Sequence, residues 1–569
     1  MLPHRLFIPV VIFATGIFCS ESKTSEWYPC PVYTFSGNST LDAECVIHNA
    51  PLCYPGICDA QKAPIENIDV FVKRLPATTT DPKTASNVWM VQGGPGSPST
   101  GLEILMEELH LNLEGTTNVY TMDHRGSGRS TFLKCTGSSN TSEFGDEITL
   151  AEVPDCAQEL EQKYGNLASF SITSAATDLA EFISKSSNGE NTIVYGAGYG
   201  TMVVERLMHL DVPEITGYVM DSIASSSGGV KNYYLSEFDL NSGEVGDYFL
   251  ELCSTDAFCN AHFNSTSLRS VLQEVITNFD KNPNSSCAQL VSTVKNEDPN
   301  AINEPPSIIL RRMLGALLGD SIQRTYIAPV VYRLHRCGSE DIPVLTNFIE
   351  RINWFRSLGT EGPGNEYWSS ALYYLIAYSE MWEKPTPSKS EILDRFTSVR
   401  MSSGGTYWMS DHYCAFSKDT SEPCSDRNVS NYEAHGIIYE RDEYWNKSAT
   451  IPSQASVLLL SGKLDAVTPV KYAKYLLEAL QGGNKELIAF DYSAEGAVFQ
   501  SYLDELDETK GTCGAELLAS YVRNNGDLTH LNRSCTTQMP KFNLTVPTFH
   551  LHSFFGTNDA FNGEFNATS

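Results

Sequence analysis

The chain has 569 residues, of which 41% are hydrophobic, and it carries a formal net charge of −30. That length accommodates two to four domains, or one large α/β domain with an inserted cap. The negative charge argues against nucleic acid or an anionic membrane as a partner, because both are polyanions. A solvated acidic surface is the simpler interpretation of the charge.

The first 20 residues have the pattern of a secretory signal peptide. The basic residues His4 and Arg5 precede an apolar run over 6–18, and small and polar residues follow. That run is too short for a membrane span. No later stretch reaches about 18 apolar residues, and the polar C-terminal tail lacks a lipid-anchor signal. We therefore expect a secreted, extracellular protein without a membrane anchor.

The cysteines indicate an oxidising compartment. One of the fifteen falls in the predicted signal peptide, and the other fourteen show neither a CxxC pair nor zinc-site spacing, so disulfides are favoured over metal. The short spacings of Cys253/Cys259 and Cys414/Cys424 indicate two local bridges. Nine Asn-x-Ser/Thr acceptors predict a glycoprotein. They are Asn38, Asn140, Asn264, Asn284, Asn428, Asn446, Asn532, Asn543 and Asn566.

Residues 21–60 are rich in Cys and Pro and predict an irregular N-terminal segment held by disulfides. From 61 to 228, short β-rich runs alternate with helical patterns such as 174–184, whose apolar residues share one face. This alternation predicts the first part of a mainly parallel sheet that is covered on both faces. The predicted strands are 70–72, 88–91, 119–122, 192–195 and 217–220.

Residues 229–450 interrupt this alternation with aromatic-rich helical stretches such as 368–382, and they predict a helical cap. Strand patterns return at 456–460 and 487–490. Residues 451–569 are therefore predicted to complete the same core and to end in a helical segment. A sheet that is interrupted and then resumed indicates one α/β fold with an inserted cap.

The glycine-rich segment 92–97, QGGPGS, follows the strand predicted at 88–91. Glycines let the backbone turn sharply and direct N–H groups into a cavity, as an oxyanion hole requires. On its own, an ordinary glycine-rich turn would be the better interpretation. The segment 123–130, DHRGSGRS, ends the next predicted strand and indicates a buried structural turn, in which His124 has a structural role.

The segment 192–201, TIVYGAGYGT, runs from a predicted strand into a predicted helix, with small residues at the crossover. A nucleophile elbow reads G-x-S-x-G. The spacing is present, but Gly198 stands at the serine position, so no hydroxyl or thiol is available there to attack a carbonyl. Elbow nucleophiles sit in backbone geometry that costs about 1–3 kcal/mol and that glycine adopts freely.

Two later loops complete the pattern. Asp465 lies just past the strand at 456–460, where an acid that orients a histidine belongs; alone, it would be an aspartate in a surface turn. Glu495 lies in the loop after the next strand, and no histidine occurs between Asp465 and His530. Carboxyls at both positions predict a like-charge pair with at least one raised pKa, unless Glu495 turns to solvent.

In this order, the motifs resemble those of the secreted prolyl and tripeptidyl aminopeptidases over about residues 60–540. The resemblance implies an α/β-hydrolase fold and the removal of short peptides from free N-termini. It implies an oxyanion hole at Gly94 and Tyr199, and a terminal Cys513–Cys535 pair. It also implies a cap acid, Glu380, that holds the amino group of the substrate.

Two of the three triad positions depart from that family. Gly198 removes the nucleophile, and Glu495 replaces a base with a pKa of about 6.5 by a group with a pKa of about 4.3. Loss of one triad member costs roughly four to six orders of magnitude in kcat. An engineered Ser→Gly change would explain Gly198 but not Glu495, and no G-x-S-x-G occurs elsewhere to supply a displaced elbow.

The leading hypothesis is therefore a non-catalytic extracellular protein that binds a peptide, a small ligand or a protein in the former cleft or on its surface. The alternative is a residual hydrolase in which Glu495 or Asp465 activates water near Gly198. A third hypothesis is a regulator that pairs with an active relative or diverts its inhibitors. No phosphate loop, metal cluster or cofactor fingerprint occurs, so we expect no cofactor.

Overall fold

The computed structural model describes residues 26–35, 37–58, 64–136, 148–226, 233–263, 266–295, 304–359, 367–425, 427 and 429–566. The predicted signal peptide lies outside these residues, as do the glycosylation acceptors Asn140, Asn264 and Asn428. Within them, no helix is both long and apolar enough to span a membrane.

One sheet holds the nine strands found in the described residues, in the order β1-β2-β3-β5-β4-β6-β7-β8-β9. Strands β1, β2, β3 and β5 pair antiparallel, and every pair from β5/β4 to β8/β9 is parallel. The bounds are β1 Tyr28–Cys30, β2 Ala43–Pro51, β3 Asn67–Leu75, β4 Asn87–Val91, β5 Asn118–Met122, β6 Thr192–Ala197, β7 Ile215–Asp221, β8 Ser456–Gly462 and β9 Lys485–Phe490.

Helices cover both faces of the sheet, so the central strands are apolar without alternation: every residue of β4, β5 and β8 is buried. Helices α1, α17 and α18 pack with one face, and α2, α3, α4 and α16 with the other. Their bounds are α1 Glu103–Asn112, α2 Val153–Tyr164, α3 Ile172–Ser186, α4 Tyr199–Leu210, α16 Val470–Ala479, α17 Ala497–Gln500 and α18 Cys513–Arg523.

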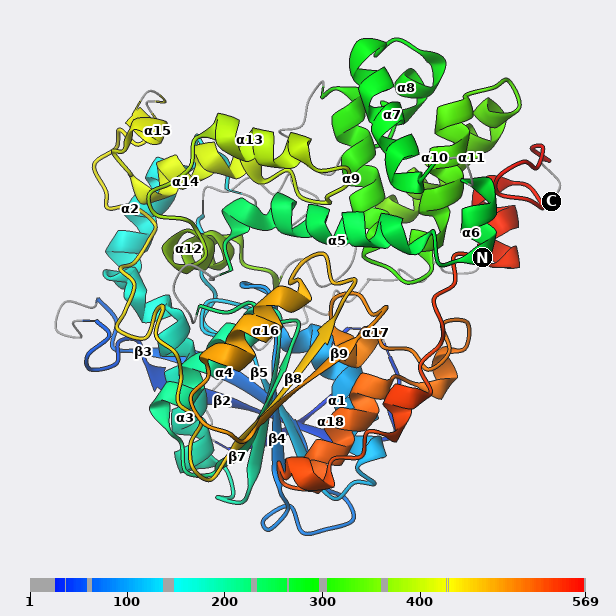
Figure 1. The fold of residues 1–569 in the computed structure, drawn as a ribbon. Coiled ribbons are helices and arrows are strands. Elements are labelled where there is room, and N and C mark those ends of the chain that lie inside the picture. The colour runs from blue at the N-terminus through cyan, green and yellow to red at the C-terminus, as the bar shows by residue number, and fades with distance from the viewer. Residues whose placement is uncertain are drawn as a thin grey trace, which may run out of the picture.

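A helical cap, α5 to α15, is inserted between β7 and β8 and lies over one end of the sheet (Figure 1). The predicted α/β fold with a mainly parallel sheet and a helical insertion is thereby confirmed. The bounds are α5 Phe238–Leu252, α6 Ala257–His262, α7 Leu268–Lys281, α8 Ser286–Val291, α9 Pro306–Leu318, α10 Ile327–Arg336, α11 Asp341–Gly359, α12 Ser370–Glu380, α13 Lys389–Ser398, α14 Met409–Ser417 and α15 Glu422–Ser425.

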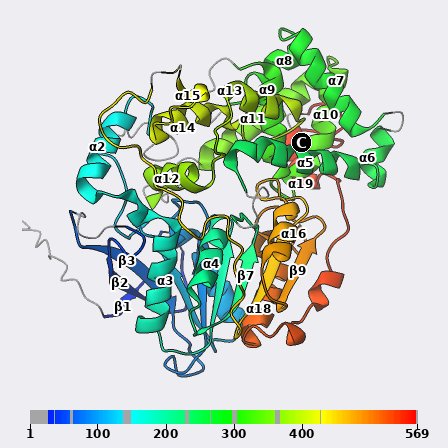
Figure 2. The ribbon, with the colours of Figure 1, turned by 60° about the vertical axis from the view of Figure 1, so that its left-hand side comes forward.

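Two ends of the chain differ from the prediction. The segment 21–60 was expected to be irregular, yet β1 and β2 within it extend the sheet, because β2 pairs with β3 from Glu44 to Pro51. At the other end, the chain rises from α18 to the cap (Figure 2), where α19, Thr548–His550, lies. Phe555 and Phe561 belong to the apolar cluster of α7, α10 and α11.

Seven disulfides pair the fourteen cysteines of the described residues. The predicted local bridges Cys253–Cys259 and Cys414–Cys424 are confirmed, and so is the Cys513–Cys535 pair that the resemblance implies. The others are Cys30–Cys45, Cys53–Cys58, Cys135–Cys156 and Cys287–Cys337. So many bridges are typical of extracellular proteins.

Candidate functional site

A cavity of about 630 Å³ lies between the carboxyl ends of the parallel strands and the cap. The sheet contributes the loops that follow β4, β6, β7, β8 and β9, and the cap contributes mostly apolar and aromatic side chains. Its lining residues include Gly94, Gly198, Tyr199, Ser222, Tyr233, Phe238, Tyr373, Met381, Thr468, Glu495 and Phe499. Ligand sites of α/β sheets occur at this end of the strands.

Gly198 occupies the turn between β6 and α4, with φ +53° and ψ −121°. The flanking glycines are required by packing. A Cβ on Gly196 would lie 2.6 Å from the carbonyl oxygen of Gly200, and one on Gly200 would lie 2.5 Å from that of Val91. A Cβ on Gly198 would meet only Oε1 of Glu495, at 3.9 Å. The turn therefore has the form of an elbow, with room for a side chain that is absent.

The glycine-rich turn lies against this elbow. A Cβ on Gly93 would lie 3.0 Å from the carbonyl oxygen of Ala197, so the two backbones approach closely. Gly94 and Tyr199 both line the cavity beside Gly198. The structure thus brings the two residues assigned to the oxyanion hole to the same wall of the cavity as the vacant nucleophile position.

Asp465 is fully buried, and both of its carboxyl oxygens accept hydrogen bonds. Its Oδ1 accepts from the backbone N–H of Val467 at 3.0 Å and of Thr468 at 2.7 Å, and its Oδ2 accepts from the Thr468 hydroxyl at 2.8 Å. The Ser222 hydroxyl also interacts with this carboxyl and lies 3.5 Å from Oδ1 of Asp221, to which it can donate as well. Ser222 therefore supplies the donor that a histidine would bring to a triad acid.

Glu495 has different surroundings. Its side chain is exposed to the cavity, and within the described residues it makes no hydrogen bond or ion pair. Asp221 lies beneath it, fully buried, and accepts from the backbone N–H groups of Ala497 and Val498, each at 2.8 Å. Three carboxyls from three strand ends therefore converge on one wall of the cavity.

No cation neutralises these three carboxyls: in the part of the chain that the structure describes, none of them has a Lys, Arg or His partner. Burial raises the pKa of Asp221 to about 6 and raises that of Asp465. Desolvation and the charges of Asp465 and Asp221 raise the pKa of Glu495, although its side chain is open to the cavity. The like-charge pair predicted from sequence is thus present, with Glu495 facing the cavity.

Glu380 is not brought into the cavity. It is 2% exposed, and its carboxyl is bound by Arg206 at 2.7 Å and by the Tyr439 hydroxyl at 2.8 Å. Arg206 also lies 3.6 Å from Asp442. The expected role of Glu380, holding the amino group of a substrate, therefore has no support in its position: the carboxyl forms a buried ion pair between α4 and the cap.

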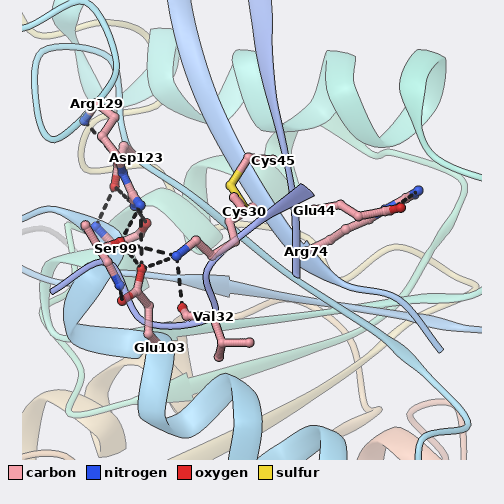
Figure 3. Close-up of a disulfide and its surroundings, with 11 residues drawn as sticks. Cys30, Val32, Glu44, Cys45, Arg74, Ser99, Glu103, Asp123 and Arg129 are labelled. Carbon is pink, nitrogen blue, oxygen red and sulfur yellow. Dashed lines mark hydrogen bonds and ion pairs between the residues drawn. A yellow bond between two sulfur atoms is a disulfide. The ribbon is translucent and has the colours of Figure 1, made fainter. Parts of the chain in front are cut away.

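The turn at 123–130 is structural, as predicted. Asp123 is fully buried and accepts from the backbone N–H of Ser99 at 2.6 Å and from Nε of Arg129 at 2.7 Å (Figure 3). His124 is buried, with Nε2 3.3 Å from the carbonyl oxygen of Gln92, and so supports the glycine-rich turn. Arg125 forms a buried ion pair with Asp178 at 2.5 Å.

Sequence reasoning missed Asp221, Ser222 and Tyr233. The first two directly follow the strand predicted at 217–220, and polar residues at the carboxyl end of a parallel strand are a usable signal. Tyr233 carries no such signal, because only the docking of the cap places it on the cavity.

No protein-family model matches the chain, and no curated protein matches its sequence. Among solved structures it is similar to alpha/beta hydrolase domain-containing protein 10 from mouse, with 9% identity, a TM-score of 0.30, and coverage of 84% of this chain and 97% of the other. It is also similar to an esterase from Exiguobacterium antarcticum, with 12% identity, a TM-score of 0.29, and coverage of 80% and 96%.

A third similar structure is the monoacylglycerol lipase of Paleococcus ferrophilus, with 12% identity, a TM-score of 0.28, and coverage of 80% of this chain and 99% of the other. Identities this low carry no functional argument. The strand order, the elbow between β6 and α4, and the glycine-rich turn after β4 are themselves the features of one fold. The chain has the α/β-hydrolase fold.

Proposed function

We propose that this protein is a secreted, non-catalytic member of the α/β-hydrolase superfamily, resembling the prolyl and tripeptidyl aminopeptidases, that acts by binding a ligand in the former active-site cavity. The observation that carries the proposal is the turn at Gly198, which has the backbone of a nucleophile elbow and no side chain to attack with. Covalent acyl transfer requires that nucleophile and a base beside it.

The other hydroxyls on the cavity wall do not replace it. Ser222 accepts a hydrogen bond from the backbone N–H of Gly496 at 2.6 Å and donates to Asp465. Thr468 also donates to Asp465. The described residues that line the cavity include no histidine, lysine or cysteine. Both aliphatic hydroxyls therefore interact with buried acids, and no described imidazole lies beside them.

Labelling with a fluorophosphonate probe tests this proposal. We expect no labelling of the natural protein and no turnover of aminoacyl or tripeptidyl substrates. Gly198→Ser alone should stay inactive because no imidazole is present, whereas Gly198→Ser combined with Glu495→His restores both missing groups and is expected to recover measurable labelling. Stoichiometric labelling of the natural protein would contradict the proposal.

A second candidate is a hydrolase that uses water instead of a serine. The favouring observation is that Oε1 of Glu495 lies 3.9 Å from the vacant Cβ position, with its pKa raised toward that of a general base for neutral solution. The fluorophosphonate probe would not inhibit this activity. The activity would be lost in Glu495→Gln, and it would rise with pH as Glu495 ionises. Turnover that is unchanged in Glu495→Gln would remove this candidate.

Secretion and glycosylation belong to the same proposal. The disulfides and the acceptors Asn38, Asn284, Asn446, Asn532 and Asn543 in described segments support it. Expression in a eukaryotic secretory system should yield a protein in the medium whose mass falls on treatment with peptide N-glycosidase. Retention in the cytosol with free thiols would contradict it.

A further inference from the structure

The described wall of the cavity carries charge of only one sign. Among the described residues, Glu495 is the only acidic residue that lines the cavity, and no lysine, arginine or histidine lines it. Asp465 and Asp221 stand directly behind Glu495 and are fully buried. Arg206, which lies behind Tyr199, is already paired with Glu380 at 2.7 Å. The cavity therefore presents negative charge that no described residue on its wall offsets.

Two buried tyrosines point to an absent ligand independently of the carboxyls. Tyr199 and Tyr233 line the cavity and are each 4% exposed, yet within the described residues neither hydroxyl has a hydrogen-bond partner. Neither hydroxyl is among the fully enclosed polar atoms that lack a partner, so both are open to the cavity and available to a ligand. Tyr233 lies close enough to Glu495 and Tyr373 for its ionisation to feel their charges, so these polar groups share one region.

The remaining wall is apolar. Phe238, Met381 and Phe499 line the cavity with the tyrosine rings, and a volume of about 630 Å³ falls in the range of small-ligand sites. Aromatic and thioether surfaces around one carboxylate are the setting in which proteins bind ammonium groups, through a charge-assisted hydrogen bond and cation–π contacts.

Building on the function proposed above, we propose that the cavity binds an organic ammonium ion with an apolar body, and that the ammonium group lies over Gly198 against Glu495. The space vacated by the missing side chain at 198 receives the cation, and Glu495, at the former base position, becomes its anchor. The hydroxyls of Tyr199 and Tyr233 accept its remaining N–H groups. The apolar body packs against Phe238, Met381 and Phe499.

The proposal predicts how affinity changes with pH. An ammonium ion needs Glu495 ionised, and the pKa of Glu495 is raised by its deep position and by Asp465 and Asp221. The other titratable groups at the cavity are Tyr199, Tyr233 and Tyr373, whose pKa values are raised by burial, so they stay neutral. Affinity for an alkylammonium ion should therefore increase as pH rises from 6 to about 8.5. A neutral ligand should show no such rise, and a carboxylate ligand the opposite trend.

The test uses calorimetric titration of the full secreted protein with three probes of one shape: 2-phenylethylamine, 2-phenylethanol and phenylacetate. We expect saturable binding of the amine in the millimolar range or tighter, at least about tenfold tighter than the alcohol, and no binding of phenylacetate. Glu495→Gln should abolish that preference. Glu433→Gln, which removes the same charge from an exposed loop residue, should leave it intact.

Further arms identify the source of the amine. A dipeptide with a free N-terminus and its N-acetyl form distinguish a peptide amino group from a free monoamine. Tyr233→Phe should weaken amine binding about threefold or more without changing the pH trend. If Glu495→Gln does not fold, the pH series on the natural protein decides alone.

Equal affinity for amine and alcohol, or no saturable amine binding up to millimolar concentration, overturns the ligand assignment. Neither result bears on catalytic inactivity, because fluorophosphonate labelling reports on that separately.

Discussion

Two clusters of buried charge in this protein contrast sharply. Beside the turn at 123–130, every carboxylate has a guanidinium: Asp178 pairs with Arg125, and Asp123 pairs with Arg129. At the cavity, Asp221, Asp465 and Glu495 have none among the residues that the structure describes. Since Arg129 and the surrounding donors outweigh burial, the pKa of Asp123 is lowered, whereas those of the cavity carboxyls are raised.

The contrast distinguishes buried charges that hold the fold together from buried charges at a functional site. A buried charge that only holds structure must be compensated within the protein, because the cost of desolvating it is large. A wall of uncompensated carboxyls is retained at a cost in stability, and such sites are where function is expected. The two clusters should therefore respond oppositely to mutation and to pH.

The largest expected effect is at the compensated cluster. Arg125→Ala leaves Asp178 buried without its partner and should lower the free energy of unfolding by about 3–5 kcal/mol, measured by chemical denaturation. It also frees the carbonyl oxygens of Leu52 and Ser169, which Arg125 binds. A loss below about 1 kcal/mol would mean that this cluster is not structural.

The next effect is at the elbow. Gly198→Ala has space for its methyl group but must adopt φ near +53°, so we expect a loss of about 1–3 kcal/mol from backbone strain. Gly483→Ala is the matched control, because a Cβ there meets nothing within 4 Å and no positive φ is involved. The comparison breaks down if both variants unfold at the same denaturant concentration.

A smaller effect is expected at Ser222, which has φ +55°. Ser222→Ala removes the donor to Asp465 and the acceptor of the Gly496 N–H, and should cost about 1–2 kcal/mol in unfolding free energy. Ser222→Gly loses the same bonds but relieves the positive φ, so it should be the more stable of the two. Equal stabilities would show that position 222 stores no strain.

The smallest expected effect is on the pH dependence of stability at Glu495. The folded-state pKa of Glu495 is raised above its unfolded value, so the folded protein holds its proton longer and stability falls as pH rises above about 4.3. Glu495→Gln removes that decline. Its melting temperature should therefore gain on the natural protein by about 1–2 °C between pH 5 and 8.5. Asp123, with its lowered pKa, contributes stability that is instead lost as pH falls. If the difference in melting temperature between Glu495→Gln and the natural protein did not change with pH, the carboxyl of Glu495 would not be uncompensated.

Much of the architecture was predictable because periodicity and turn chemistry are local. The strand predicted at 88–91 is β4, and the helix predicted at 174–184 is the middle of α3. The antiparallel strands β1 and β2 were missed, because a Cys- and Pro-rich composition gives no apolar run and their pairing depends on β3. The final segment was assigned to the core, although its aromatic residues pack against the cap.

The amino-acid sequence by itself determined what is chemically missing: a glycine at the elbow and a glutamate at the base position are facts of covalent structure. Only the tertiary structure decided what those residues contact. Glu380 is neutralised by Arg206, Ser222 satisfies Asp465, and Asp221 joins Glu495 from another strand end. The physical reason is that these groups lie up to 274 residues apart, as Ser222 and Gly496 do, and meet only when the sheet is complete and the cap has docked.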